Sequence, residues 1–327
     1  MLACASLALG QVGQPKQLAT GVFFREGDVK KGHCNLGWVL FNDYALIIDA
    51  NFPEAATEAL AQAKSAAGNK PLRFLFNTSA DEDHAFGNEV WGAQGATIIA
   101  SDECAKALAT RGPTQFAALS TARPDVKASK LRLPQMTFDQ KLVLDDGATR
   151  VELTALIPAA QHPAGAVAWL PKAKVLFTGD LCVNGPFNNL TDANLDGWLA
   201  ALDRLLKLDI AIVAPGHGPS GDKKLLEGQR DFLLELRKQV QVGVAAKKKL
   251  DEIKADVKIT DARLANWVGP GLPIQIEAVF KAVTAKAVAP PKSDSKKPTE
   301  AKPAAPPVGN KPVPVKDAAP PVRKKLP

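Results

Sequence analysis

The first half of the chain carries short apolar or alternating stretches, as β-strands do, and turn residues bound each of them. These stretches are Gly21–Phe24, Gly37–Phe41, Ala45–Asp49, Leu72–Asn77 and Ala96–Ser101. From Pro53 to Ala67 the apolar spacing is helical, with proline in the first turn and Gly68 after the last residue. A second helix is predicted to begin at Asp102 and to run toward Arg111. The first half of the chain is therefore predicted to form a strand meander followed by a helix, two strands and a second helix.

The second half repeats this order. Strand patterns lie near Met136–Leu144, Arg150–Leu156, Ala166–Leu170, Lys174–Thr178 and Ile210–Ala214. Helical patterns cover Leu195–Leu206 and a long segment from about Lys223, and residues 251–286 read as one or two further helices. Two strand groups, each followed by helices, predict two sheets packed face to face with helices outside.

Charge separates the tail from the rest of the chain. The net charge is +7, but residues 287–327 hold nine Lys and Arg against three acids, so the remaining body is nearly neutral. A basic patch for specific nucleic-acid binding is therefore not expected on the folded part. The tail has eleven prolines and no aromatic residue, which predicts disorder. It is either a solvated spacer or a segment that contacts anionic polymers or surfaces.

These observations predict four segments: an N-terminal tail or partial signal (1–16), a main domain (17–250), a helical extension (251–286) and the disordered tail (287–327). The apolar start resembles the end of a secretory signal but is short and has no basic residues before it. A periplasmic or secreted location is slightly favoured over a cytoplasmic one. The four cysteines lie far apart and are expected to be free thiols.

A loop crowded with carboxylates follows the predicted strand Leu72–Asn77. It contains Asp81, Asp83 and His84 within four positions. Such groups repel one another unless water or a cation separates them, and oxygen with imidazole ligands suits Zn, Fe or Mn. An acidic surface loop is the alternative for this segment alone.

Three of the four histidines follow predicted strands: His84, His162 and His217. The carboxylate of Asp180 lies between the last two, in Thr178-Gly179-Asp180. This distribution favours one shared metal site, whereas His33 is expected to be structural.

The order of these motifs resembles the metallo-β-lactamase-fold metallohydrolase superfamily, and Asp83-His84-Ala85-Phe86-Gly87-Asn88 is especially similar to its quinoprotein-relay-type zinc members. The resemblance implies a four-layer αββα sandwich. It assigns His162 to a first metal site, Asp83, His84 and His217 to a second, and Asp180 to both.

The resemblance also assigns Asp49 a supporting position behind the ligands. In the family the loop reads H-x-H-x-D-H, whereas this chain has Ser79-x-Asp81-x-Asp83-His84. Both histidines of the first site are replaced, and Asp81 is the candidate substitute ligand there.

The resulting hypothesis is a metal-dependent hydrolase with one or two zinc ions, Fe or Mn being alternatives. Asp83 would orient the nucleophile, and the substrate would be a small ester, thioester, amide or lactam. A non-catalytic metal-binding or ligand-binding relative is the alternative, with redox use of a di-iron site as a third reading. No motif indicates the oligomeric state.

Overall fold

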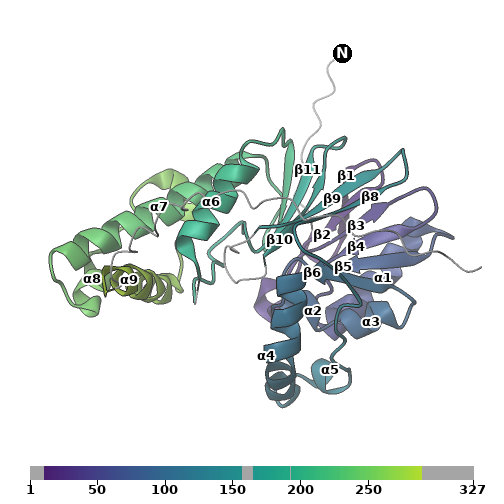
Figure 1. Ribbon diagram of the computed structural model, residues 1–327, viewed down its shortest axis with the longest axis horizontal. Helices are drawn as coiled ribbons and strands as arrows, with labels where there is room; N and C mark the ends of the chain where they lie inside the picture. Colours follow the sequence, from purple (N-terminus) through teal and green to yellow (C-terminus); the bar gives the residue numbers. More distant parts are fainter. Residues whose placement is uncertain (1–10, 157–164, 192, 289–327) are drawn as a thin grey trace, which may run out of the picture. The chain divides into compact units, whose positions relative to one another are not determined.

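Two β-sheets pack face to face in the computed structural model, which describes residues 11–156, 165–191 and 193–288 (Figure 1). The first sheet has seven strands in the order β1-β2-β3-β4-β5-β6-β7, and the second has five in the order β12-β11-β10-β9-β8. The strands of the first sheet are β1 (Pro15–Ala19), β2 (Val22–Arg25), β3 (Leu36–Leu40), β4 (Ala45–Ile48), β5 (Leu72–Phe76), β6 (Thr97–Ser101) and β7 (Met136–Phe138). Those of the second are β8 (Lys141–Asp145), β9 (Arg150–Ala155), β10 (Ala166–Leu170), β11 (Val175–Gly179) and β12 (Ile212–Pro215).

The facing sides of the two sheets form an apolar core. Phe24 and Ile48 of the first sheet belong to the same buried cluster as Leu153 and Phe177 of the second. Alternating side chains on each strand point into this core or outward, so each sheet also needs a cover on its outer face.

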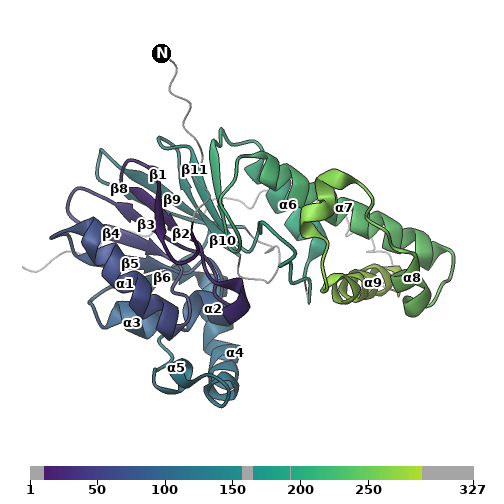
Figure 2. The same cartoon turned by 180° about the vertical axis from the view of Figure 1, so that it is seen from behind.

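Helices supply that cover (Figures 1 and 2). The outer face of the first sheet packs against α1 (Pro53–Ala67) and α3 (Asn88–Gly92). The outer face of the second packs against α6 (Leu195–Leu205) and α7 (Lys224–Ala245). The predicted αββα sandwich is confirmed.

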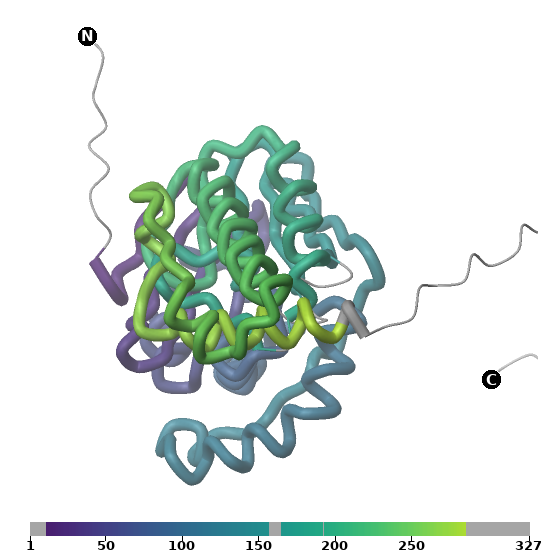
Figure 3. The backbone as a smooth tube through the Cα atoms, turned by 90° about the vertical axis from the view of Figure 1, so that its left-hand side faces the viewer, coloured from purple at the N-terminus to yellow at the C-terminus, as the bar shows by residue number. Residues whose placement is uncertain are grey.

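The segment predicted as a helical extension completes the second helical layer. It forms α8 (Leu250–Asp256), the 3₁₀ helix η2 (Ala262–Trp267) and α9 (Leu272–Val288). All three contact α7, which runs beside α6 in the green part of Figure 3. Over the described ranges, we find no helix with the length and apolar character that a membrane span requires.

Three sequence predictions need correction. The N-terminal tail predicted for residues 1–16 overlaps the first two residues of β1, an edge strand that pairs with β2. The single strand expected at Met136–Leu144 is two strands: β7 is parallel to β6 in the first sheet, and β8 is antiparallel to β9 in the second. Apolar residues lie on both sides of Asp139-Gln140, so their pattern alone does not show that the chain changes sheet there.

The third correction concerns the helix expected to end near Arg111, with a loop to Leu133. The helix α4 (Asp102–Ser120) continues through Pro113, and α5 (Pro124–Lys127) follows. Phe116 packs on Phe86 with ring centroids 5.0 Å apart, and this packing offsets the hydrogen bond that Pro113 cannot donate. The remaining short elements are η1 (Val29–Lys31) and α2 (Glu82–Ala85). The predictions for residues 1–10 and 289–327 lie outside the described residues.

Candidate metal centre

The candidate site residues follow the carboxyl ends of four strands. Asp49 follows β4, the loop with Asp83 and His84 follows β5, Asp180 follows β11, and His217 lies just beyond β12. Strands β4 and β5 are parallel, and so are β11 and β12. Each sheet therefore delivers its polar residues at the ends of one parallel pair, where such strands usually hold ligands.

Four side chains converge there in a connected chain of short distances. His84 Nε2 lies 3.2 Å from Asp180 Oδ1, and Asp180 Oδ1 lies 3.4 Å from His217 Nε2. His217 Nε2 in turn lies 3.2 Å from Asp83 Oδ2, and His84 Nε2 lies 3.9 Å from Asp83 Oδ1. His84, Asp180 and His217 present their ligand atoms within 4.8 Å of one another.

Asp49 contacts His84 at Nδ1, the ring nitrogen opposite Nε2. One carboxylate oxygen of Asp49 lies 3.0 Å from His84 Nδ1, and the backbone N–H of Thr78 donates to the other over 2.8 Å. The Thr78 hydroxyl also contacts this carboxylate. A carboxylate at Nδ1 favours the N–H there and leaves Nε2 as the ligand atom, the usual arrangement behind a metal-bound histidine.

Amide side chains anchor the loop that carries Asp83 and His84. Asn77 Nδ2 donates to the backbone oxygen of His84 over 3.0 Å, and Asn77 and Asn88 exchange hydrogen bonds of 2.9 and 3.0 Å. The backbone N–H of Ala50 donates to the same His84 oxygen over 2.9 Å. The Asn88 of the D-H-x-F-G-N motif therefore fixes the loop and does not face the ligand atoms.

Two glycines allow the backbone to approach the site closely. Gly179 has φ of +50°, and a Cβ there would overlap the Thr78 hydroxyl. A Cβ on Gly216 would overlap Asp180 Oδ1. Both positions need glycine because a side chain would displace a site residue.

The site is rich in negative charge. Burial lowers the pKa of His84, but Cys34 and the carboxylates of Asp49, Asp180 and Asp83 outweigh it and raise that pKa well above its usual value. Burial likewise lowers the pKa of His217, and the same Asp180 and Asp83 raise it overall. The excess of carboxylates favours a bound cation in this buried pocket.

The first metal site, where Ser79 and Asp81 replace the two family histidines, differs from the second. The Asp81 carboxylate lies 3.6 Å from Nη2 of Arg111, and its backbone N–H donates to the Ser79 hydroxyl over 3.0 Å. Asp81 joins neither of the two ligand groups found among the described residues. His162 lies in the segment 157–164, outside the described residues.

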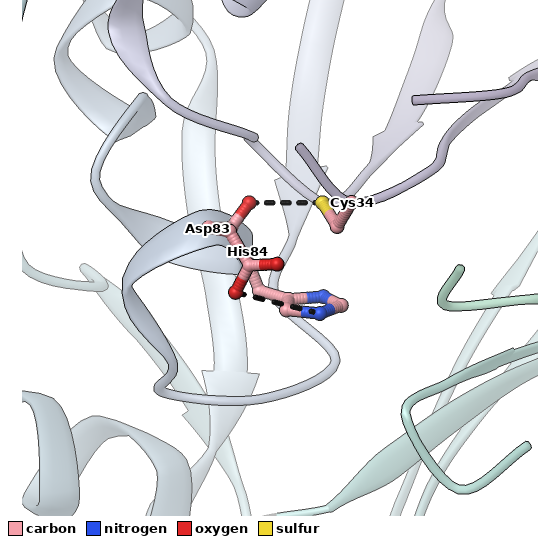
Figure 4. Close-up of side chains that lie close together, drawn as sticks. All are labelled: Cys34, Asp83 and His84. Carbon is pink, nitrogen blue, oxygen red and sulfur yellow. Dashed lines mark hydrogen bonds and ion pairs between the residues drawn. The ribbon is translucent and has the colours of Figure 1, made fainter. Parts of the chain in front are cut away.

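Sequence analysis did not identify two nearby residues, Cys34 and Arg111. Cys34 is fully buried, and its thiol donates to the backbone oxygen of Asp83 over 2.8 Å (Figure 4). Burial raises the pKa of this thiol to about 12. Of the other described cysteines, Cys182 is a buried core residue as expected, and Cys104 is also a buried free thiol. Cys34 precedes β3, far from the loop in sequence, so no local spacing indicates its position.

The second-site residues fit a divalent cation. Bonds of about 2.0–2.2 Å in a tetrahedral zinc site place neighbouring ligand atoms about 3.3–3.6 Å apart. The separations of 3.2, 3.4 and 3.2 Å that link His84, Asp180, His217 and Asp83 are close to this range. In the described part of the chain His84 Nε2 is buried and makes no hydrogen bond, so a cation would give it the partner that it needs.

A family model for the metallo-beta-lactamase superfamily matches residues 29–217, which span both sheets and the site. The chain belongs to this superfamily. Its predicted membership is confirmed, and the chain is a relative of metal-dependent hydrolases.

The similar proteins are diverse. A metallo-beta-lactamase type 2 of Bacillus sp. (strain 170) is 36% identical over 93 residues, which are 27% of this chain and 35% of that protein. The chain thus matches about a third of the length of this curated relative.

Two solved structures share the fold. The inverting sec-alkylsulfatase Pisa1 from Pseudomonas sp. has a TM-score of 0.64 at 15% identity, over 82% of this chain and 50% of that one. A metallo-beta-lactamase from Pontibacter korlensis has a TM-score of 0.56 at 23% identity, over 68% of this chain and 98% of that one. At these identities the likeness concerns the fold alone.

Proposed function

We propose that the chain is a metal-dependent hydrolase that works with a single Zn²⁺ held by Asp83, His84, Asp180 and His217. The observation that carries this proposal is the series of separations of 3.2–3.4 Å that links the four side chains. A zinc ion held there supplies a Lewis acid that polarises a substrate carbonyl and makes water more acidic.

The residues around the ion have separate tasks. Asp49 keeps His84 oriented through its 3.0 Å contact with Nδ1. Asp83 has one carboxylate oxygen beside His217 and the other beside His84, so it can accept a hydrogen bond from an attacking water and orient it. The substrate would be an ester, thioester, amide or lactam of small size.

Arg111 supports the choice of one metal over two. A guanidinium 3.6 Å from Asp81 neutralises the carboxylate that would replace a first-site histidine. A second divalent cation next to this arginine would meet like-charge repulsion. We therefore assign Asp81 to the ion pair with Arg111 and not to a metal.

Metal analysis by plasma mass spectrometry on the untagged protein tests the assignment. We expect one equivalent of zinc in the unaltered protein, its loss in His84→Ala and His217→Ala, and its retention in Asp81→Asn and Arg111→Met. Two equivalents, one of them lost in Asp81→Asn or His162→Ala, would overturn the single-metal assignment. No bound metal would overturn the hydrolase proposal.

Turnover is tested on p-nitrophenyl esters, a thioester, a chromogenic lactam and a secondary alkyl sulfate, because relatives of this fold include lactamases and an alkylsulfatase. We expect hydrolysis of at least one, abolished by chelation and by Asp83→Asn.

A non-catalytic, metal-binding protein is the second candidate, and one observation favours it. The cavity lined by Ser79, Asp81, Gly165 and Asp180, among others, has a volume of only about 10 Å³, room for about one water molecule. A full zinc complement without turnover on the panel would favour this alternative.

We also keep export across a membrane and contact of the basic tail with anionic surfaces as proposals. The charge of residues 287–327 supports the second of these.

A further inference from the structure

The sulfur of Cys34 lies within reach of the proposed metal site. The ligand atoms of Cys34, Asp83 and His84 all lie within 4.8 Å of one another, and Figure 4 shows the three residues close together, with the sulfur directed at the backbone oxygen of Asp83. This group shares His84 with the group formed by His84, Asp180 and His217. Two sets of candidate ligands therefore meet at one imidazole.

That imidazole is the second observation. His84 is completely buried, and its Nε2 makes no hydrogen bond within the described part of the chain, although Asp180 Oδ1 lies 3.2 Å away. Its Nδ1 is already committed to Asp49 at 3.0 Å. A buried nitrogen without a hydrogen bond is costly unless a ligand contacts it.

We propose that Cys34 is a thiolate ligand of this zinc centre beside His84, in the place that Asp83 would otherwise fill. Asp180 and His217 then complete the protein ligands, and one position stays open for water. The inference rests on the proposed function for the presence of the metal, and it adds a sulfur ligand that none of the sequence motifs supplies.

The backbone around Cys34 is held so that only the side chain must move. Asn51 Nδ2 donates to the Cys34 oxygen over 2.6 Å, and the next residue, Asn35, donates its backbone N–H to the Gly216 oxygen over 2.7 Å. Asn35 Nδ2 also donates to the Pro215 oxygen over 2.8 Å. The segment thus joins the Asp83–His84 loop to the His217 loop and places Cys34 between them.

The required movement is small. Zn–S bonds of about 2.3 Å and Zn–N bonds of about 2.0–2.1 Å put sulfur and nitrogen about 3.6 Å apart in a tetrahedral site. Within the group of Cys34, Asp83 and His84, the limit of 4.8 Å means that the sulfur and the His84 nitrogen must close by roughly 1 Å at most. On coordination the thiol loses its proton to solvent and gives up its 2.8 Å hydrogen bond to the Asp83 oxygen.

A thiolate also selects the metal. Soft sulfur ligands favour zinc, whereas carboxylates and water suit manganese and magnesium. We therefore expect the unaltered protein to prefer Zn²⁺ over Mn²⁺ and Cys34→Ser to lose much of this preference.

X-ray absorption at the zinc edge of the loaded full-length protein tests the proposal directly. We expect one sulfur scatterer at about 2.3 Å in the unaltered protein. It should disappear in Cys34→Ser and Cys34→Ala and persist in Cys182→Ser. The last variant is the matched control because Cys182 is equally buried and its thiol points to the backbone oxygen of Leu225, 3.7 Å away. The Co²⁺-loaded protein should show a sulfur-to-cobalt charge-transfer band that is absent in both Cys34 variants and present in Cys182→Ser.

Competition with a chelator gives a second readout. Loss of a residue that only hydrogen-bonds to a metal ligand already weakens metal binding about 10–100-fold. Loss of a ligand itself, in Cys34→Ala, should therefore weaken zinc binding by at least about 10-fold. Bound zinc with only nitrogen and oxygen neighbours would overturn the role of Cys34 and leave the proposed function standing. Absence of bound zinc would overturn the proposed function itself. Circular dichroism of both Cys34 variants checks that they fold, and the spectrum of the unaltered protein decides the question even if they do not.

Discussion

Replacing Asp49 by asparagine should weaken metal binding while it preserves the shape of the side chain. The carboxylate of Asp49 accepts the backbone N–H of Thr78 over 2.8 Å and faces His84 Nδ1 at 3.0 Å. If the asparagine oxygen keeps the Thr78 bond, its NH₂ group points at the N–H of His84, and two donors then face each other. Losing a hydrogen bond to a charged group costs about 1.5–3 kcal/mol.

This cost corresponds to a loss of zinc affinity of about 10–100-fold, because 1.4 kcal/mol is a factor of ten. Competition with a chromophoric chelator measures the affinity, and Asp203→Asn is the control because Asp203 is about half-exposed and pairs with Arg230 on the surface. Zinc affinity of a folded Asp49→Asn protein within about twofold of the unaltered one would refute the argument that Asp49 orients the ligand.

Three further predictions concern stability and the tail. Gly179→Ala should lower the free energy of unfolding in urea by more than about 1–2 kcal/mol, because φ is +50° and the new Cβ would overlap Thr78. Gly147→Ala, where φ is +85° but nothing lies within 4 Å, should show only the backbone strain, and equal effects would contradict the overlap. Trp198→Ala should cost about 3–5 kcal/mol in the same assay, since the ring is fully buried in the helix-covered core, and a loss below about 1 kcal/mol would contradict that packing. Deletion of residues 289–327 should weaken the binding of the protein to anionic phospholipid vesicles and make the remaining binding less dependent on salt. Unchanged binding would refute a role for the tail.

Much of the fold, and the positions of the second-site residues at strand ends, could be predicted because both depend on local patterns. Four of the five residues of β5, the strand before Asp83-His84, are apolar, and the loop with this motif is the next segment of the chain. Asp180 and His217 likewise follow strands β11 and β12. Residues at the carboxyl ends of neighbouring parallel strands meet in space, which groups Asp49 with the Asp83–His84 loop and Asp180 with His217. The family resemblance joined these two groups, which lie on different sheets.

The remaining features depend on packing between distant segments. Cys34 is 49 positions before Asp83, and a 3₁₀ turn and buried asparagine contacts bring it to the site. Arg111 reaches Asp81 because α4 packs beside the short helix α2 that follows Asp81, whereas the sequence predicts only that a helix runs toward Arg111. Neither position follows from periodicity, because the deciding energy comes from contacts with residues far along the chain.

The loop after β5 is anchored in two separate places. Its later part, with His84, is held by Asn77, Asn88 and the backbone of Ala50, whereas its early part is held by the local Ser79–Asp81 hydrogen bond. Substitutions at Ser79 and Asp81 therefore leave the anchors of His84 untouched. This independence means that residues 79 and 81 can vary in sequence while the position of His84 stays fixed.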